Sequence, residues 1–161
     1  MPGEITIYTD GAASGNPGPG GYGVVLISGP HRLEKSKGFI LTTNNRMELM
    51  AVIDGLESLK NPGSRVTVYT DSRYVSDSVE KGWLFQWESK SFKKKKNHDL
   101  WKRFLKVYRK HKVRFVWVKG HASNPENELC DSLAVAASKG TDRVEDTGYV
   151  PGDGKDDLFK E

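Results

Sequence analysis

Two short segments of the chain share one pattern, and no other feature of the sequence constrains the fold as strongly. The segments "EITIYTD" at 4–10 and "RVTVYTD" at 65–71 alternate aliphatic residues with Thr and Tyr, and both end on Tyr-Thr-Asp. Alternation of this kind predicts two β-strands. Because the aliphatic positions have the same phase in both segments, we expect Asp10 and Asp71 to leave the same face of their strands.

These two acids have a functional and a structural interpretation. If the strands are parallel neighbours, Asp10 and Asp71 lie side by side at the C-terminal ends, where open α/β sheets place their ligands. Two adjacent carboxylates repel each other unless they share a proton or bind a cation. In the structural alternative, each aspartate only starts a turn or caps the following helix.

The rest of the hydrophobic pattern predicts an α/β sheet of mixed direction with helices packed on it. The first strand and two further strands form an antiparallel meander, and a later helix begins with Asn124 as its N-cap and Pro125 in its first turn. The further strands are expected at 21–28, 33–41 and 113–120, and the helices at 45–60, 72–82, 99–111 and 125–138.

Composition indicates a globular protein without a membrane span. The hydrophobic content is 36% and the charged content 29%, and no apolar run reaches the roughly 18 residues of a membrane span. The start "MPGEITIYTD" has no signal-peptide pattern. The single cysteine, Cys130, is typical of the reducing cytosol, so we expect a cytoplasmic protein.

The charges are distributed unevenly along the chain. Residues 81–112 contain twelve Lys and Arg against two acids, whereas residues 140–161 contain three against seven. A concentrated basic segment indicates a polyanionic partner, although such a run can also be a solvated surface.

Two further acids can join Asp10 and Asp71. Glu48 lies near the start of a predicted helix, where it can instead complete a capping box with Asn45. Asp131 lies in an Ala-rich helix, where an exposed position is the alternative. Four carboxylates without Cys or His ligand spacing suit a hard cation, Mg²⁺ by default with Mn²⁺ as a substitute, and one or two ions can bind.

Four segments, in order, resemble bacterial ribonuclease HI, the type 1 ribonuclease H family: "YTDGAASGNPGPGGYG", "TTNNRMEL", "YTDSRYV" and "VKGHASNPENELCDSLA". Each carries one of the four acids, and the similarity extends over about residues 4–138. The resemblance implies a ribonuclease H-like α/β fold, a five-stranded mixed sheet flanked by helices. It implies a hydrolase, an endonuclease that cleaves the RNA strand of RNA–DNA hybrids by a Mg²⁺-dependent two-metal mechanism and leaves 5′-phosphate and 3′-hydroxyl ends.

The same resemblance implies roles for individual residues. The catalytic residues are four metal-binding carboxylates and a histidine that assists proton transfer or product release: Asp10, Glu48, Asp71, Asp131 and His121. The residues that bind the hybrid are Gly11, Asn16, Thr43, Asn44, Asn45, Arg73, Trp83, Trp87, Lys93, Lys94, Lys95 and Lys96. The two adjacent asparagines face the RNA strand, whose 2′-hydroxyl distinguishes it from DNA. Thr43 and Asn16 belong to a phosphate pocket for the DNA strand. Arg73 departs from a glutamine of the family, so we expect it to contact phosphate.

The resemblance also divides the chain. Residues 1–139 are the ribonuclease H catalytic domain, with a basic handle at about 81–98, and residues 140–161 are an acidic C-terminal tail. The aromatic residues of the handle either pack it or form a groove for the DNA strand. About two of the four adjacent lysines at 93–96 are expected to contact phosphates. We expect a monomer that binds the hybrid and no membrane.

Two other functions compete with this one. The first is a related metal nuclease or strand-transfer enzyme that acts on DNA, and the second is a non-catalytic module that binds hybrids. The Asn44-Asn45 pair and the basic handle favour the hybrid-specific ribonuclease over the DNA enzyme. The presence of all four acids argues against the non-catalytic module.

Overall fold

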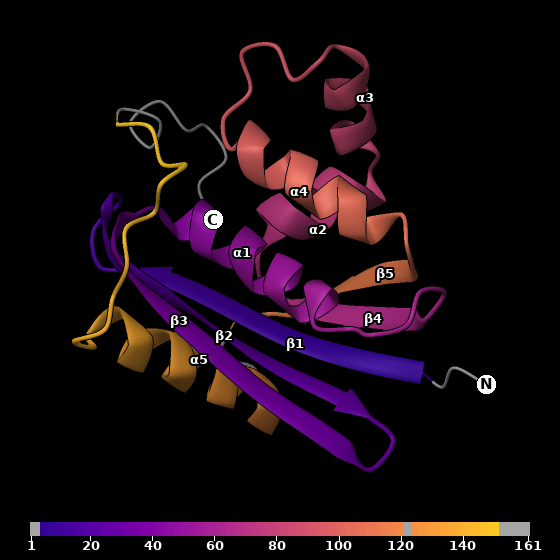
Figure 1. Cartoon of the computed structure of the whole chain (residues 1–161), viewed down its shortest axis with the longest axis horizontal. Coiled ribbons are helices and arrows are strands. Elements are labelled where there is room, and N and C mark those ends of the chain that lie inside the picture. The colour runs from indigo at the N-terminus through magenta and orange to yellow at the C-terminus, as the bar shows by residue number, and fades with distance from the viewer. Residues whose placement is uncertain (1–3, 121–123, 152–161) are drawn as a thin grey trace.

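The fold is built on a five-stranded sheet with the strand order β3-β2-β1-β4-β5. The structure is a computed structural model that describes residues 4–120 and 124–151. The first three strands are antiparallel, and β4 and β5 extend the sheet parallel to β1 (Figure 1). The strands are β1 (Glu4–Ala13), β2 (Gly18–Ser28), β3 (His31–Thr42), β4 (Arg65–Thr70) and β5 (Lys112–Trp117). The predicted five-stranded mixed sheet is confirmed.

The two Tyr-Thr-Asp segments are parallel neighbours, as their shared phase predicts. Ile5 pairs with Val66, and Ile7 pairs with Val68. All four side chains are buried, because they face the helices that cover this side of the sheet. Burial of one face explains the pairing register, since a slip by one residue would turn these side chains to the opposite face.

The ends of these two strands differ from the prediction. β1 was expected to end at Asp10, but it continues to Ala13, because residues 10–13 remain paired with β2. β4 ends at Thr70, so Asp71 lies in the turn that follows its strand. The two acids therefore leave the sheet from a continuing strand and from a turn.

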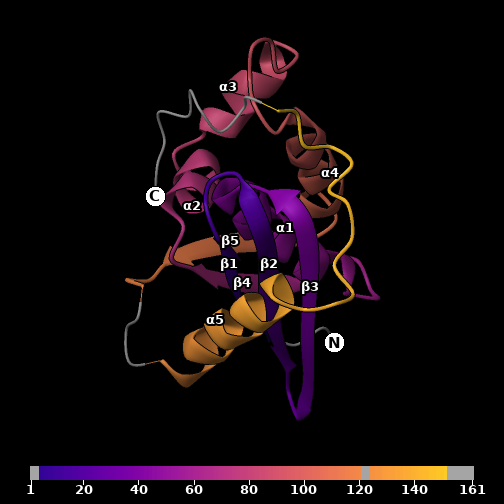
Figure 2. The same ribbon diagram turned by 90° about the vertical axis from the view of Figure 1, so that its left-hand side faces the viewer.

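Helices cover both faces of the sheet. α5 packs on one face against β1, β2 and β3, and the other four helices lie on the opposite face (Figure 2). The helices are α1 (Asn44–Glu57), α2 (Arg73–Glu80), α3 (Trp83–Ser89), α4 (His98–Tyr108) and α5 (Pro125–Ser138). Asn124 caps α5, as predicted, by accepting hydrogen bonds from the N–H groups of Glu126 and Asn127. None of the helices in the described ranges has the length and hydropathy to cross a membrane.

The helix α3 was missed, because the sequence shows no start signal for it. Its N-cap residue, Gly82, adopts a left-handed conformation and provides no side-chain cap. N-caps are recognised in a sequence by Ser, Thr, Asp or Asn, and none of these stands there.

The described part of the acidic tail, residues 140–151, crosses the end of β3 and pairs with it at one position, Val144 beside Phe39 (Figure 1). The N–H of Val144 donates to the carbonyl of Gly38 over 3.0 Å, and the N–H of Ile40 donates to the carbonyl of Val144 over 2.9 Å. These two hydrogen bonds attach the tail to the edge of the sheet. One of its acids, Asp146, is nevertheless buried.

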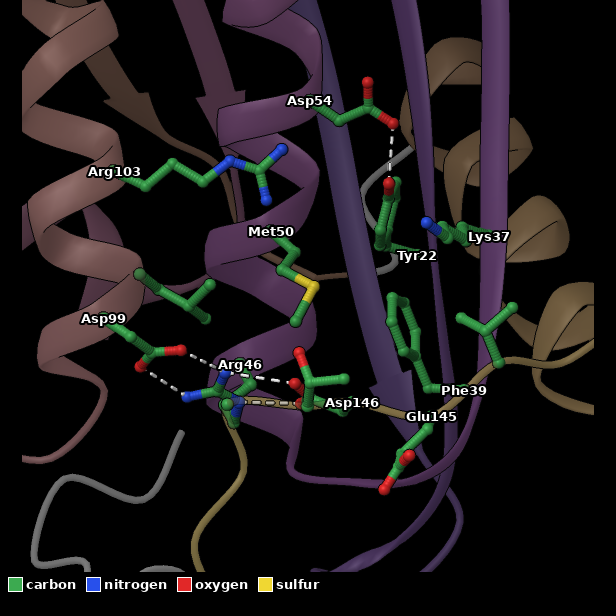
Figure 3. Close-up of a pocket in the computed structure, with 14 residues that line it drawn as sticks. Tyr22, Lys37, Phe39, Arg46, Met50, Asp54, Asp99, Arg103, Glu145 and Asp146 are labelled. Atoms are coloured by element: carbon green, nitrogen blue, oxygen red, sulfur yellow. Dashed lines mark hydrogen bonds and ion pairs between the residues drawn. The ribbon is translucent and has the colours of Figure 1, made fainter.

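Asp146 is buried because it binds Arg46, a fully buried residue of α1. Its Oδ2 accepts from Arg46 Nε over 2.7 Å and from the hydroxyl of Thr42 over 2.7 Å. Arg46 also donates to Asp99 over 2.8 and 3.0 Å and to Asn97 over 3.2 Å, so its guanidinium is fully hydrogen-bonded. The group forms one wall of a cavity of about 360 Å³ (Figure 3). The tail is thus fastened to the first turn of α1.

Candidate active site

Three acids from separate elements meet at the C-terminal ends of β1 and β4. One carboxylate oxygen from each of Asp10, Glu48 and Asp71 lies within 4.8 Å of the other two. Glu48, on α1, is 3% exposed, and the two aspartates are partly buried. The side-by-side arrangement expected of Asp10 and Asp71 is therefore present, with Glu48 as the third member.

The close approach of α1 to β1 depends on Gly11. A Cβ atom at Gly11 would lie 2.5 Å from the backbone N of Glu48 and 2.5 Å from the carbonyl carbon of Met47. These are backbone atoms, so they cannot rotate away as a flexible side chain would. The N–H of Gly11 also donates to Asp10 Oδ1 over 2.9 Å. Glycine at this position therefore allows Glu48 to approach Asp10.

The three acids form an environment that favours a cation. Burial, the charge of Asp71 and a hydrogen bond with Asp131 raise the pKa of Asp10 to about 8 from its ordinary value of 3.8. Asp71 Oδ1 is buried and accepts no hydrogen bond from the described residues. Oxygen ligands at this spacing suit a hard divalent cation. The residues present therefore fit the metal that the sequence predicts.

The fourth acid, Asp131, lies outside this trio but in the same cavity. It comes from α5, on the opposite face of the sheet, and lies close enough to Asp10 to contribute to the raised pKa of that carboxyl. The cavity has a volume of about 590 Å³ and includes all four acids together with Asn44. Asp131 is partly exposed and lines this cavity beside Asn127 and Glu128.

The residues of the cavity that were not singled out in the sequence include Asn127 and Lys119. Asn127 precedes Asp131 by one helical turn, and its Oδ1 is buried without a hydrogen-bond partner among the described residues. Lys119 lines the cavity from the segment that follows β5. The helical spacing from Asp131 could have indicated Asn127, whereas no local pattern indicates Lys119. His121 lies outside the described residues.

The predicted hybrid-binding residues at the start of α1 are close together. The N–H of Asn44 donates to Asn16 Oδ1 over 3.1 Å, which joins the loop after β1 to the helix. Thr43 is the N-cap of α1, and its hydroxyl accepts from the N–H of Arg46 over 3.3 Å. The capping-box alternative for Glu48 is therefore wrong, because the N-cap is Thr43 and Asn45 already lies inside the first turn.

The two tryptophans of the basic handle, Trp83 and Trp87, have different surroundings. Trp87 packs against Trp101 of α4, with ring centroids 5.9 Å apart, so it secures the handle to the core. Trp83 lies beneath Lys81, whose Nζ is 5.4 Å from the ring centroid.

The four handle lysines fall into two groups. Lys93 and Lys94 are exposed. Lys95 and Lys96 are partly buried, and Lys95 Nζ lies 5.1 Å from the ring centroid of Trp87. Lys93 and Lys94 are thus the more exposed pair of the four.

Comparison with known proteins places these features in a family. The model of the family described as RNase H matches residues 2–139. A ribonuclease H of Trichodesmium erythraeum is 57% identical over 151 residues, which cover 91% of this chain and 96% of that protein. A ribonuclease H of Desulforamulus reducens is 58% identical over 141 residues, or 84% of this chain and 88% of that protein.

Solved structures show the same similarity. LC9-RNase H1, a type 1 RNase H with the type 2 active-site motif, has a TM-score of 0.77 and 31% identity, covering 86% of this chain and 73% of that one. LC11-RNase H1 in complex with an RNA/DNA hybrid has a TM-score of 0.59 and 29% identity, covering 81% of this chain and 94% of that one.

Proposed function

The chain belongs to the ribonuclease H family and hydrolyses the RNA strand of RNA–DNA hybrids, and we propose that Asp10, Glu48 and Asp71 hold Mg²⁺ for this reaction. The observation that supports the proposal is the meeting of three carboxylates within 4.8 Å in a cavity of about 590 Å³. When bound, the cation supplies positive charge that stabilises the transition state at the phosphate and activates the attacking water. The products carry 5′-phosphate and 3′-hydroxyl ends.

The chain's own residues position these groups. Asp131 lines the same cavity as Asp10, and Gly11 allows α1 to bring Glu48 to the same point. We propose Asp131 as a fourth catalytic carboxylate. Assistance by His121 in proton transfer or product release stays a prediction.

A direct assay tests the proposed function. Labelled duplexes of RNA–DNA hybrid, DNA and RNA are incubated with the protein in Mg²⁺, in Mn²⁺ and in EDTA. We expect cleavage of the RNA strand of the hybrid alone, in the presence of either metal. Cleavage of the DNA duplex at a similar rate would support the DNA-acting alternative, and binding of the hybrid without cleavage would support the non-catalytic module.

We propose that Asn44 and Asn45 recognise the RNA strand through its 2′-hydroxyl. Asn44 lines the cavity of the acids, and the neighbouring Asn45 lies in the first turn of the same helix. An amide both donates and accepts hydrogen bonds, as a hydroxyl does. With amides at this position, the strand that approaches the carboxylates can be recognised as RNA by its ribose 2′-hydroxyl.

Asn45→Ala should reduce the preference for hybrid over DNA duplex by about 10-fold, with a smaller loss of binding to the DNA duplex. A site that hydrogen-bonds a hydroxyl rejects the analogue without it, and truncating the amide removes that penalty. Equilibrium binding to both duplexes in EDTA measures the effect. Asn61→Ala, at an exposed position beyond the other end of α1, is the control. Equal losses for both duplexes would contradict the role.

The exposed handle lysines provide a second prediction. We propose that Lys93 and Lys94 contact phosphates of the DNA strand, so replacing both by Ser should lower the salt slope of hybrid binding by roughly 0.7–0.9 per contact. Because the handle adds uniform binding, KM should rise while kcat stays nearly constant. Kinetics across a salt series measures both effects. Lys95→Ser, in which the replaced ammonium lies over Trp87, is the matched control and should change the slope less. Parallel slopes with equal KM would rule out the contact.

We also propose that the protein acts as a cytoplasmic monomer. Its single cysteine, Cys130, is buried, and burial raises the pKa of its thiol to about 12, so it is unreactive at neutral pH. Residues 1–139 would form the catalytic domain, with the handle at about 81–98, and residues 140–161 the acidic tail. Sedimentation at several protein concentrations tests the monomeric state.

A further inference from the structure

Trp117, the last residue of β5, contacts the backbone of one of the three clustered acids. Its indole Nε1–H donates to the carbonyl oxygen of Asp71 over 2.9 Å. Trp117 pairs with Thr70, the last residue of β4, so the contact reaches just past the end of the neighbouring strand. The side chain is 38% exposed, which is unusual for a tryptophan on the helix-covered face of a sheet. It therefore lies next to Asp71 and precedes Val118, and both of these residues line the cavity of the acids.

The Asp71 carbonyl belongs to neither of the regular elements beside it. β4 ends one residue before it, and α2 begins after the N-cap Ser72, whose own carbonyl accepts the first bond of the helix from Ser76. The indole N–H thus orients a peptide group that belongs to neither the hydrogen-bond pattern of the sheet nor that of the helix. The orientation of this peptide sets the direction in which the Asp71 side chain leaves the backbone.

The edge of the indole ring contacts Asp71, and the guanidinium of Arg73 stacks on the face of the same ring. The guanidinium carbon of Arg73 lies 3.8 Å from the ring centroid. Arg73 is exposed and forms no ion pair within residues 4–120 and 124–151. A guanidinium stacked on an aromatic ring keeps the donors at its edge available, and their planar arrangement matches the oxygens of a phosphate.

We propose that Trp117 is a positioning residue with two separable functions. The edge of its ring holds Asp71 in the direction that metal binding requires, and the face of its ring holds Arg73 as a phosphate-binding group beside the metal site. This inference rests on the proposed function, because it assumes that Asp71 binds a cation and that a nucleic acid phosphate approaches Arg73. It adds a residue that neither touches the metal nor contacts the substrate itself.

Substitutions at the two residues separate the functions. Trp117→Phe keeps an aromatic face for Arg73 but has no N–H for Asp71. Arg73→Gln keeps the indole bond to Asp71 but removes the cation. Trp117→Leu removes both the N–H and the ring. Tyr108→Phe, which removes one side-chain donor from α4 outside the candidate site, is the control.

Two binding measurements, which do not depend on turnover, test the two functions separately. Calorimetric titration of the free protein with Mg²⁺ should show affinity about 10-fold weaker for Trp117→Phe and Trp117→Leu, and unchanged for Arg73→Gln and the control. Binding of a labelled hybrid in EDTA across a salt series should show a slope lower by roughly 0.7–0.9 for Arg73→Gln and Trp117→Leu. The slope for Trp117→Phe should stay near that of the original protein.

The effects on kcat and KM should separate the two functions in the same way. Trp117→Phe should lower kcat at saturating hybrid with little change in KM, and Arg73→Gln should raise KM with little change in kcat. Unchanged Mg²⁺ affinity in Trp117→Phe would overturn the first function, and an unchanged salt slope in Arg73→Gln would overturn the second. If Trp117→Leu melts well below the other variants, the Phe and Gln variants still decide both.

Failure of this inference can be distinguished from failure of the proposed function. If the original protein neither binds Mg²⁺ nor cleaves the hybrid, the proposed function is wrong. If the original protein does both and the variants behave like it, only the role of Trp117 is wrong.

Discussion

Asp10→Asn should lower the rate of hybrid hydrolysis by about 10³-fold or more while the protein remains folded. A neutral amide is a poor ligand for a hard cation, and the variant leaves Glu48 and Asp71 with too little charge to hold it. Metal catalysis supplies several kcal/mol of transition-state stabilisation, and each 1.36 kcal/mol corresponds to about a factor of ten in rate. Single-turnover cleavage of a labelled hybrid at saturating Mg²⁺ measures the loss.

The same substitution should stabilise the protein in EDTA, and the gain should depend on pH. The pKa of Asp10 is raised to about 8 by burial, by Asp71 and by the bond to Asp131, from an ordinary value of 3.8. Between these two values the folded state keeps a proton that the unfolded state has released. The free energy of unfolding of the original protein therefore falls as the pH rises from about 4 to about 8.

In Asp10→Asn this part of the pH dependence is absent. The variant should become more stable than the original protein by a margin that grows with pH and reaches about 1 kcal/mol or more near pH 8. Urea denaturation in EDTA at several pH values measures the margin, and Glu34→Gln, at an exposed acid of β3, is the control. A variant with substantial activity, or one destabilised in EDTA, would contradict the clustering of the acids.

Asp146→Ala should lower the free energy of unfolding by about 3–5 kcal/mol, the largest stability effect that we expect. The substitution leaves the buried guanidinium of Arg46 without the carboxylate that accepts two of its hydrogen bonds, at 2.7 and 3.1 Å. Removal of one partner from a buried ion pair costs far more than an exposed pair contributes, because the remaining charge stays desolvated. The hydroxyl of Thr42 loses its acceptor as well.

Three substitutions test this interpretation in urea denaturation. Asp146→Asn retains an acceptor oxygen without the charge and should lose less stability than Asp146→Ala. Glu145→Ala, at the exposed neighbouring acid, should change stability by less than about 0.5 kcal/mol. Gly148→Ala should also destabilise, because its Cβ would lie 1.9 Å from Asp99 Oδ2 and 2.7 Å from Arg46 Nη2. If Asp146→Ala and Glu145→Ala melt alike, the tail does not stabilise the fold through Asp146.

The contact at Asp146 also explains why the acidic tail matters to the candidate site. Arg46 lies in the first turn of α1, which carries Asn45 and, two residues after Arg46, Glu48. The tail binds this turn through the bond between Asp146 and Arg46. The absence of a side chain at Gly11 lets β1 lie against the same turn. The family match ends at residue 139, so this support comes from a part of the chain outside the matched residues.

The sequence by itself determined the elements of the sheet and the acids that meet on it. The register of β1 and β4 could be predicted because side chains alternate with a period of two, and the two Tyr-Thr-Asp segments have the same phase. The positions of Asp10 and Asp71 follow directly from that register. Glu48 and Asp131 could be proposed from their segments, but the sequence left a structural alternative open for each.

Only the tertiary structure decided the contacts that join distant parts of the chain. Arg46 and Asp146 are separated by 100 residues, and Asp71 and Trp117 by 46. Such contacts depend on how helices, strands and the tail pack together, and no local period or capping signal carries that information. The helix α3 belongs to the same class, because packing against the core stabilises it where the N-cap signal is missing.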